Sequence, residues 1–294
     1  MIWSKPSSLL LLPRNIDRLW QPLLAGMAVL CAVLLLLIVA FLLKEAIPAL
    51  HDGGWRSFFN DQSWYPLENM FGLLPMLWAS LAIVSLALLL AAPLGLANAL
   101  FVRFYAPSFL VTPYRLMLAL LAGMPSVVYG LWGLTVIVPI IAAYHQPGTS
   151  VLAASLVLAL MILPTVALTC LAALEAVPSS LHAGAAALGM SKQGLLLGVI
   201  VPAARYGIGA GMVLATARAL GETMVVLMVA GNVVQTPHSI FDPVRALTAN
   251  IALEMGYATD LHRAGLFTSG LILTLLVLVL AWFAARTMHK YQYA

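Results

Sequence analysis

The stretch ATARALGETMVVLMVAGN, residues 215–232, is almost wholly small or apolar, yet it contains Arg218 and Glu222. A run of this kind predicts a helix in a lipid bilayer, where a charge near the centre costs about 2.5–3.5 kcal/mol. Each neighbouring Leu or Val returns only about 0.3–0.6 kcal/mol, so the run offsets about one charge and not two. We therefore expect the side that carries Arg218 to line a bundle interior or a wet cavity.

Arg218 and Glu222 are four residues apart, which predicts that they share one helix face. Two interpretations stay open at this point: an internal ion pair that locks helices together, or a path for an ion or solute. A guanidinium suits oxyanions because its planar fork donates two parallel hydrogen bonds. In the second interpretation Glu222 would orient Arg218 and compensate its charge while the path is empty.

The composition of the whole chain agrees with a membrane protein. Of its 294 residues 63% are hydrophobic and 8% are charged, whereas soluble domains are about half apolar and a quarter charged. We predict an all-α integral membrane protein whose six transmembrane helices, two of them interrupted (the third and the fifth), lie at 21–43, 73–101, 114–143, 151–174, 206–233 and 265–287. The two cysteines lie in apolar runs, so we expect neither a disulfide framework nor a thiolate metal site.

The orientation follows from the Lys and Arg residues of the loops, which accumulate on the cytoplasmic side. With the N-terminus inside, the inner side holds Lys5, Arg14, Arg18, Arg103, Arg115, Lys192, Arg205, Arg286 and Lys290, and the outer side only Lys44, Arg56, Arg245 and Arg263. We therefore predict that both termini are cytoplasmic. The predicted parts are a cytoplasmic N-terminal segment 1–20, the first helix 21–43, an extracytoplasmic loop 44–72, a five-helix core 73–288 with a cytoplasmic loop 175–205, and a cytoplasmic tail 289–294.

The long inner loop contains AGAAALGMSKQGLLLGVIVPAARYGI, residues 183–208. It predicts a helix, a glycine break, a short helix, a proline break and a further helix. Gly189 suits the left-handed conformation that ends a helix, Ser191 can cap the next one, and Pro202 ends that helix or starts another. The middle piece, 190–201, would lie across the membrane surface, where a cytoplasmic partner could hold it.

The third span contains GMPSVVYGLWGL, residues 123–134. Pro125 removes a backbone donor and predicts a kink, while Gly123, Gly130 and Gly133 allow close helix approach. Ser126 and Tyr129 bring polar groups to the break. This pattern fits a packing kink as well as a substrate path, since broken helices often frame transporter sites.

Several chemistries leave no trace in the sequence. It has neither a G-x-x-x-x-G-K-[ST] phosphate loop nor an H-E-x-x-H motif. The six histidines are scattered mainly through loops and termini. We therefore expect no catalytic residue, no metal site, no cofactor bound by this chain, and no role in nucleic-acid binding.

The spacing of residues 183–202 resembles the EAA loop of binding-protein-dependent ABC importer permeases. In that pattern Glu-Ala-Ala, three residues and Gly precede nine residues and an Ile-x-Leu-Pro-like end. Here Gly189 precedes nine residues, 190–198, and the stretch VIVP that ends at Pro202. The Glu of the family pattern falls at Ala183, so a polar contact with the ATPase is missing or is supplied elsewhere.

Together with GMPSVVYGLWGL and RALGETM, this loop resembles phosphate-uptake ABC permeases of the PstC-like kind, over roughly residues 20–290. The resemblance implies a non-catalytic permease subunit in a bacterial inner membrane. Its partners would be a PstA-like second permease, a PstB-like ATPase dimer that binds ATP, and an extracytoplasmic PstS-like phosphate-binding protein. It implies a substrate pathway at Arg218, Glu222, Ser126 and Tyr129, and ATPase coupling at Ala183, Gly184, Ala185, Gly189, Met190, Ser191, Lys192 and Pro202.

Three alternatives remain open at the level of the sequence. The importer could carry another tetrahedral oxyanion, such as sulfate or molybdate, because any of these satisfies Arg218. An ion-driven secondary carrier could use Glu222 as a proton or cation site. A membrane scaffold without transport activity is the third alternative.

Overall fold

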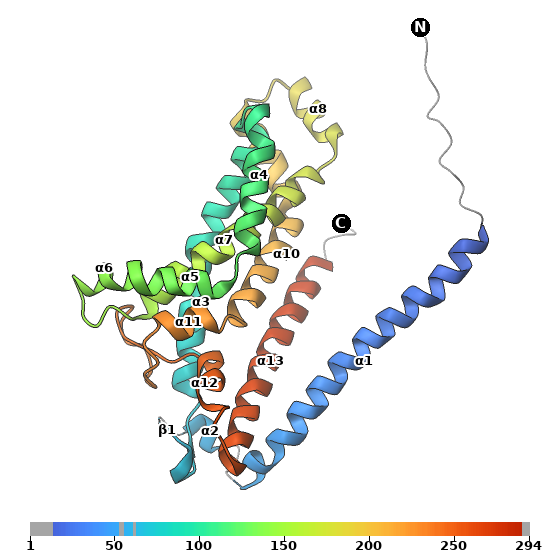
Figure 1. The fold of residues 1–294 in the computed structure, drawn as a ribbon. Helices are drawn as coiled ribbons and strands as arrows, with labels where there is room; N and C mark the ends of the chain where they lie inside the picture. The colour runs from blue at the N-terminus through green and yellow to red at the C-terminus, as the bar shows by residue number, and fades with distance from the viewer. Residues whose placement is uncertain (1–13, 53–55, 61–62, 290–294) are drawn as a thin grey trace.

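The computed structural model describes residues 14–52, 56–60 and 63–289, which form an elongated and almost wholly helical bundle (Figure 1). Within this part of the chain, five helices are long and apolar enough to cross a membrane, and one bent pair raises the candidate spans to six. The all-α membrane fold is thus confirmed. The five long helices are built on α1 (Arg14–Asp52), α3 (Leu74–Leu100), α7 (Val151–Glu175), α10 (Val201–Leu220) and α13 (Asp260–His289). Most of the predicted segments 1–20 and 289–294 lies outside the described residues.

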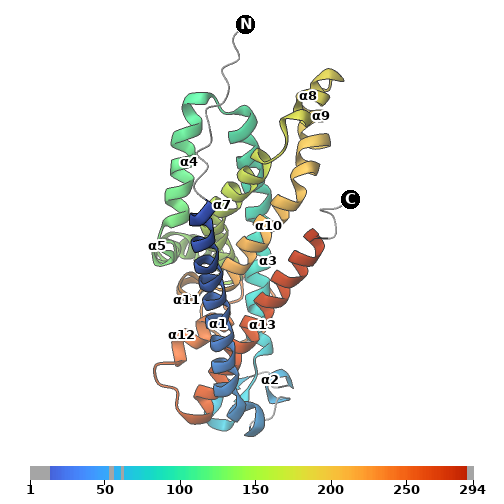
Figure 2. The same ribbon diagram turned by 90° about the vertical axis from the view of Figure 1, so that its right-hand side faces the viewer.

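The two ends of the bundle carry different small elements (Figures 1 and 2). One end, here called the hairpin end, holds α2 (Ser57–Asn60), the antiparallel strands β1 (Trp64–Tyr65) and β2 (Met70–Phe71), the turn η1 (Pro66–Glu68) between them, and α12 (Leu247–Glu254). The opposite end, here called the α8 end, holds α8 (Ser179–Ala187). The start of α1 and the end of α13 point toward the α8 end.

Helix α7 is the centre of the bundle, and two thirds of its apolar window is buried. It packs along α3, where Ala79, Ala87 and Ala91 are buried against it. The hydroxyl of Ser155 donates a hydrogen bond across this interface to the carbonyl of Ile83, at 3.1 Å. Small side chains and a polar cross-link are how helices associate where burial from water gives no driving force.

Helix α1 lies at the edge of the bundle and leans away from it (Figure 1). None of its apolar window is buried. Its contact with the rest of the chain is made near its C-terminal half, where Phe41 packs edge-on against Phe267 of α13 and Ala49 is fully buried. Its exposed Leu and Val side chains fit lipid, so α1 is peripheral to the bundle formed by the other spans.

The third predicted span, 114–143, is two arms at 88° to each other. The first arm is α4 (Ser108–Gly123), and the second consists of α5 (Ser126–Trp132), the π-helical turn η3 (Gly133–Ile137) and α6 (Val138–Ala142). The prediction of a kink at Pro125 is confirmed, but the break is sharper than a kinked single span. Pro125 takes an extended backbone conformation and starts the second arm, because a proline disfavours helix in the residue before it and cannot donate to the preceding turn.

The fifth span also differs from its prediction, 206–233. A continuous apolar helix runs over Lys192–Leu220, made of α9 (Lys192–Leu195), the π-helical turn η4 (Leu196–Ile200) and α10. Pro202 lies in the first turn of α10, as predicted, but the predicted break there is absent, because the wider turn before it bonds the Val201 amide to the Leu196 carbonyl and accommodates the proline ring. The helix then ends at Leu220, and a short helix, α11 (Met224–Val229), follows.

Candidate substrate site at the broken span

Arg218 lies in the last turn of α10 and contacts two other spans. Its Nη2 donates to the carbonyl of Ala122, the last-turn residue of α4, at 3.2 Å. Its Nη1 lies 3.5 Å from the hydroxyl of Thr165, in the middle of α7. The side chain is nevertheless exposed on the surface of the single chain. The guanidinium is therefore held by its protein contacts while part of it stays open to an incoming group.

Helix geometry places this guanidinium near the middle of the membrane. At 1.5 Å per residue, Thr165 lies roughly 21 Å from the start of α7 at Val151 and roughly 15 Å from its end at Glu175. A hydrocarbon core is about 30 Å thick. Arg218 therefore lies level with the middle of the central helix, which agrees with the expectation that it sits at membrane depth.

Glu222 does not share a helix face with Arg218, which corrects the prediction from their spacing. Helix α10 ends at Leu220, so Glu222 lies in the break before α11. Its Oε1 accepts a hydrogen bond from the Val225 amide at 3.4 Å, and its backbone carbonyl accepts one from the Thr248 hydroxyl at 3.0 Å. Among the described residues, no ion pair joins Arg218 to Glu222. The Glu222 carboxylate therefore bonds the first turn of α11 and not the guanidinium of Arg218.

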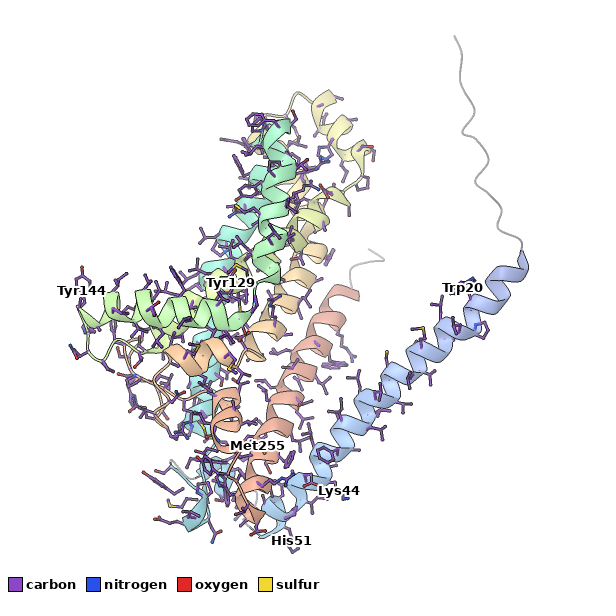
Figure 3. All side chains as sticks on the ribbon, in the orientation of Figure 1. Trp20, Lys44, His51, Tyr129, Tyr144 and Met255 are labelled. Atoms are coloured by element: carbon purple, nitrogen blue, oxygen red, sulfur yellow. The ribbon has the colours of Figure 1, made fainter. Side chains whose placement is uncertain are left out.

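Tyr129 and Ser126 lie on the second arm of the broken span. Tyr129 is near the bend, and Tyr144 is at the far tip of this arm (Figure 3). The Tyr129 hydroxyl donates to the Leu121 carbonyl at 3.0 Å, across the break, so its polar group supports the bend. Ser126 is the first residue of α5 and is half-buried. Tyr129 thus lies at the same break that Arg218 contacts. A role of Tyr129 and Ser126 in substrate movement remains a prediction.

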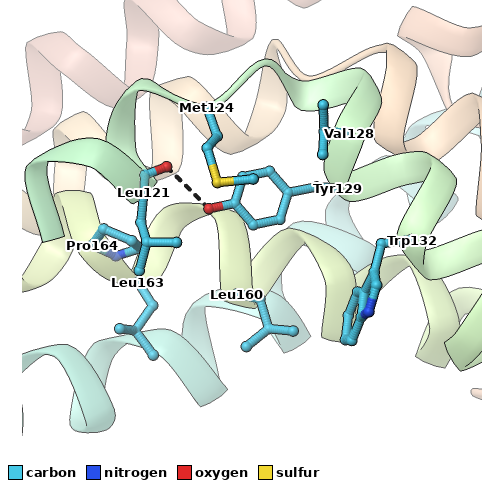
Figure 4. Close-up of a pocket in the computed structure, with 8 residues that line it drawn as sticks. All are labelled: Leu121, Met124, Val128, Tyr129, Trp132, Leu160, Leu163 and Pro164. Carbon is cyan, nitrogen blue, oxygen red and sulfur yellow. Dashed lines mark hydrogen bonds between the residues drawn. The ribbon is translucent and has the colours of Figure 1, made fainter. Parts of the chain in front are cut away.

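An open cavity of about 350 Å³ lies beside the break (Figure 4). Its lining is almost entirely apolar and comes from both arms and from α7: Leu121, Met124, Val128, Tyr129, Trp132, Leu160, Leu163 and Pro164. Two of these residues are direct chain neighbours of the Arg218 contacts, Ala122 and Thr165. A cavity whose lining is so largely apolar suits an apolar side chain better than an oxyanion.

The second arm packs closely because of two glycines. A Cβ at Gly133 would lie 2.5 Å from a methyl group of Val157 on α7. A Cβ at Gly130 would lie 2.8 Å from the Met228 sulfur and 3.3 Å from the Val225 backbone on α11. The predicted close helix approach is confirmed for Gly130 and Gly133 but not for Gly123, where an added Cβ would meet no atom within 4 Å.

The α8 end contains the predicted coupling residues. Ala183, Gly184 and Ala185 lie in α8, and of these only Ala185 is buried. Gly189 has φ of +67°, the left-handed conformation that was predicted for it. The Ser191 hydroxyl accepts from the Gly194 amide at 3.2 Å, so the predicted cap is also confirmed.

One element of the coupling prediction is wrong in its placement. Residues 190–201 do not form a separate surface helix, since Lys192 begins the helix that continues to Leu220. The separate short helix of this loop is α8, which precedes Gly189. The left-handed Gly189 changes the chain direction at the end of α8. Helix α8 is therefore the piece that projects from the bundle.

Sequence reasoning missed a buried polar cluster at the hairpin end, here called the Glu254 cluster. Oε1 of Glu254 accepts from Arg245 Nη1 at 2.7 Å. Oε2 accepts from Trp64 Nε1 at 2.7 Å and lies 2.8 Å from His262 Nε2. These residues come from β1, from the segment before α12, from α12 itself and from α13. The sequence placed them only in outer loops, because nothing local signals a contact between residues 190 positions apart.

A model of the family described as binding-protein-dependent transport system inner membrane component matches residues 91–290. This chain belongs to that family. Among curated relatives of the permease, the probable ABC transporter permease protein YqgH of Bacillus subtilis is 38% identical over 78% of this chain and 77% of its own. The phosphate transport system permease protein PstC is 35% identical in Xylella fastidiosa, over 76% and 77%, and 33% identical in Mesorhizobium japonicum, over 83% and 85%. The resemblance to PstC-like permeases is confirmed.

Solved structures support the fold of the permease. An inward-facing MetNI methionine ABC transporter chain superposes with a TM-score of 0.61 at 17% identity, covering 78% of this chain and 99% of that one. A chain of a bacterial alginate ABC transporter, in complex with an alginate pentasaccharide-bound periplasmic protein, gives 0.62 at 14% identity, covering 95% and 97%. At these identities the likeness concerns the fold alone.

Proposed function

We propose that this permease is a transmembrane subunit of an ATP-driven importer of inorganic phosphate. The observation that carries the proposal is the mid-membrane guanidinium of Arg218, which contacts the break of one span and the middle of another while it stays open on one side. A planar fork of donors matches the oxygens of a tetrahedral oxyanion. We propose phosphate as the transported oxyanion because the relatives named PstC are phosphate transport system permease proteins.

The open side of Arg218 supports a second permease as partner. A charged side chain at this depth does not face lipid, so another protein or a water-filled path has to cover it. The neighbouring face is apolar and exposed, and includes Val127, Leu131 and Trp132. The apolar cavity beside it would take a side chain of the partner, and the oxyanion path would lie between the two chains at Arg218.

The other partners attach at the two ends. The α8 end would contact a cytoplasmic ATPase dimer, which would bind and hydrolyse the ATP, and the permease itself would be non-catalytic. The hairpin end would receive a binding protein loaded with phosphate. The excess of Lys and Arg in the loops of the α8 end supports a cytoplasmic position for this end and, with it, for both termini.

The central test is phosphate uptake by the complete complex in proteoliposomes. Arg218→Ala should lower uptake roughly 10- to 100-fold, because a charge-assisted hydrogen bond contributes about 1.5–3 kcal/mol and each 1.4 kcal/mol is tenfold. Arg218→Lys should also impair uptake, since a point charge replaces a two-pronged donor. Arg205→Lys, on the same helix near the α8 end, is the matched control. Wild-type uptake by both Arg218 variants would refute a direct contact with phosphate.

Two further measurements separate the alternative functions. An uncoupler should leave uptake intact and ATP depletion should abolish it; the reverse result would favour an ion-driven carrier that uses Glu222. Competition by sulfate and molybdate should be weak when the complex contains its phosphate-binding protein. Strong competition would assign the importer to oxyanions in general.

A further inference from the structure

The segment that contains α8, residues 176–191, is attached at both ends to one corner of the bundle. Its flanking residues are Glu175, the last residue of α7, and Lys192, the first of α9. Each is held by a residue between Phe104 and Arg115. The α3–α4 corner is here defined as residues 101–115, which are the π-helical turn η2 (Phe101–Tyr105) at the end of α3 and the first half of α4.

The first attachment is an ion pair. Arg115 Nη2 of α4 donates to Glu175 Oε1 at the end of α7. The two side chains are 38% and 37% exposed, so the pair lies at the surface, where an ion pair contributes little to stability. Such an ion pair restrains the position of the α8 segment relative to α4, and it can form again after the segment has moved.

The second attachment caps a helix. Lys192 Nζ donates to the Phe104 carbonyl at 2.7 Å and lies 4.1 Å from the centre of the Tyr105 ring. The carbonyls at the C-terminus of η2 lack partners in their own helix and carry its negative dipole end, so an ammonium is favoured there. The His182 ring of α8 lies 6.0 Å from the Phe104 ring, on the same corner.

The corner leads directly to the substrate site. From Arg115, helix α4 runs without a break to Ala122, whose carbonyl accepts the hydrogen bond of Arg218. Seven residues of helix span roughly 10 Å. The alternative route, along α9 to α10, passes through the π-helical turn η4 and Pro202, where the regular α-helical hydrogen bonding is interrupted. A displacement of α8 would thus reach Arg218 more directly through α4.

We infer that Arg115, Glu175 and Lys192 are positioning residues for transport, and that α4 is the arm through which movement of α8 changes the hydrogen bond between Ala122 and Arg218. The inference rests on the proposed function, because it needs an ATPase that moves α8. It assigns Lys192 a contact within the permease in addition to any contact with the ATPase. It also assigns roles to Arg115 and Glu175, which no motif singles out.

The test is a charge exchange in the complete complex, with phosphate imported per ATP hydrolysed as the readout. Arg115→Glu and Glu175→Arg should each lower this ratio at least fivefold, and the double exchange should recover most of it. Lys192→Met should lower the ratio likewise, whereas Lys192→Arg should largely retain it. Arg103→Gln, a cation in the same corner that holds neither flanking residue, is the control and should import as wild type.

The outcomes separate the two proposals. If the wild-type complex hydrolyses ATP without importing phosphate, the proposed function fails. If the wild-type complex imports and the single variants assemble with wild-type ratios, the inference about α4 fails alone. If the double variant assembles but does not recover the ratio of phosphate imported to ATP hydrolysed, the inference about α4 also fails. Misfolding would not explain that result, because a misfolded permease would not assemble into the complex. The amount of purified complex measures assembly in every variant.

Discussion

The hairpin end and the α8 end hold their segments by different means. At the hairpin end one carboxylate, Glu254, is 8% exposed and is bound by side chains of three other segments. At the α8 end the contacts are exposed and fewer: Arg115 pairs with Glu175, and Lys192 bonds one carbonyl and lies over the Tyr105 ring. A buried, multiply bonded charge is costly to separate, whereas surface contacts break at little cost. We interpret the hairpin end as a rigid frame and the α8 end as the part able to move.

The largest test of this comparison is Glu254→Ala. It leaves the half-buried guanidinium of Arg245 without its carboxylate, for which we expect a loss of about 3–5 kcal/mol in unfolding free energy. Glu68→Ala, at an exposed position of the same hairpin, is the control and should stay within about 0.5 kcal/mol. The measurement is denaturant or thermal unfolding in detergent. Equal unfolding free energies of the Glu254→Ala and Glu68→Ala variants would contradict the interpretation of the hairpin end as a rigid frame.

Trp64→Phe removes one donor from the Glu254 cluster while an aromatic ring stays against Phe71, whose centroid lies 5.7 Å away. A hydrogen bond to a charged group contributes about 1.5–3 kcal/mol, and we expect a loss in that range. The exposed neighbour Tyr65→Phe is the matched control. A loss below 0.5 kcal/mol, in the same unfolding measurement, would show that Trp64 is held by packing alone.

Two helix caps allow a comparison within one residue type. Ser150 caps α7 and is fully buried, and its hydroxyl accepts from the Ala153 amide at 3.2 Å; Ser191 caps α9 in an exposed position. Loss of a cap costs about 0.5–2 kcal/mol. We expect Ser150→Ala to lie at the upper end of this range and Ser191→Ala at the lower end, because water replaces the exposed bond. The reverse order in unfolding experiments would contradict a firmly held α7 and a loosely held α9.

The smallest effect on stability is expected at the α8 end. Arg115→Gln and Glu175→Gln should each change the unfolding free energy by less than about 1 kcal/mol. They should nevertheless accelerate hydrogen exchange of the α8 amides, because the segment loses one attachment. Wild-type exchange in both variants would mean that the ion pair does not restrain α8.

Part of the candidate site could be predicted because its signals are local. The apolar runs, the break at Pro125, the left-handed Gly189 and the Ser191 cap depend on residues within one turn of each other. The limits of the fifth span could not be predicted, since hydropathy is continuous through residues 201–233. Helix α10 ends at Leu220, and Glu222 beyond it accepts hydrogen bonds from the Val225 amide of α11 and from the hydroxyl of Thr248, twenty-six residues later.

The sequence by itself determined that this chain belongs in a membrane and that its helices break at Pro125 and at Gly189, because composition and chain stereochemistry act locally. Only the tertiary structure decided which groups Arg218 contacts, that Glu222 is not its partner, and that Glu254 joins four segments. Those outcomes depend on side chains brought together from distant parts of the chain, and the free energy of such contacts exists only once the helices have packed.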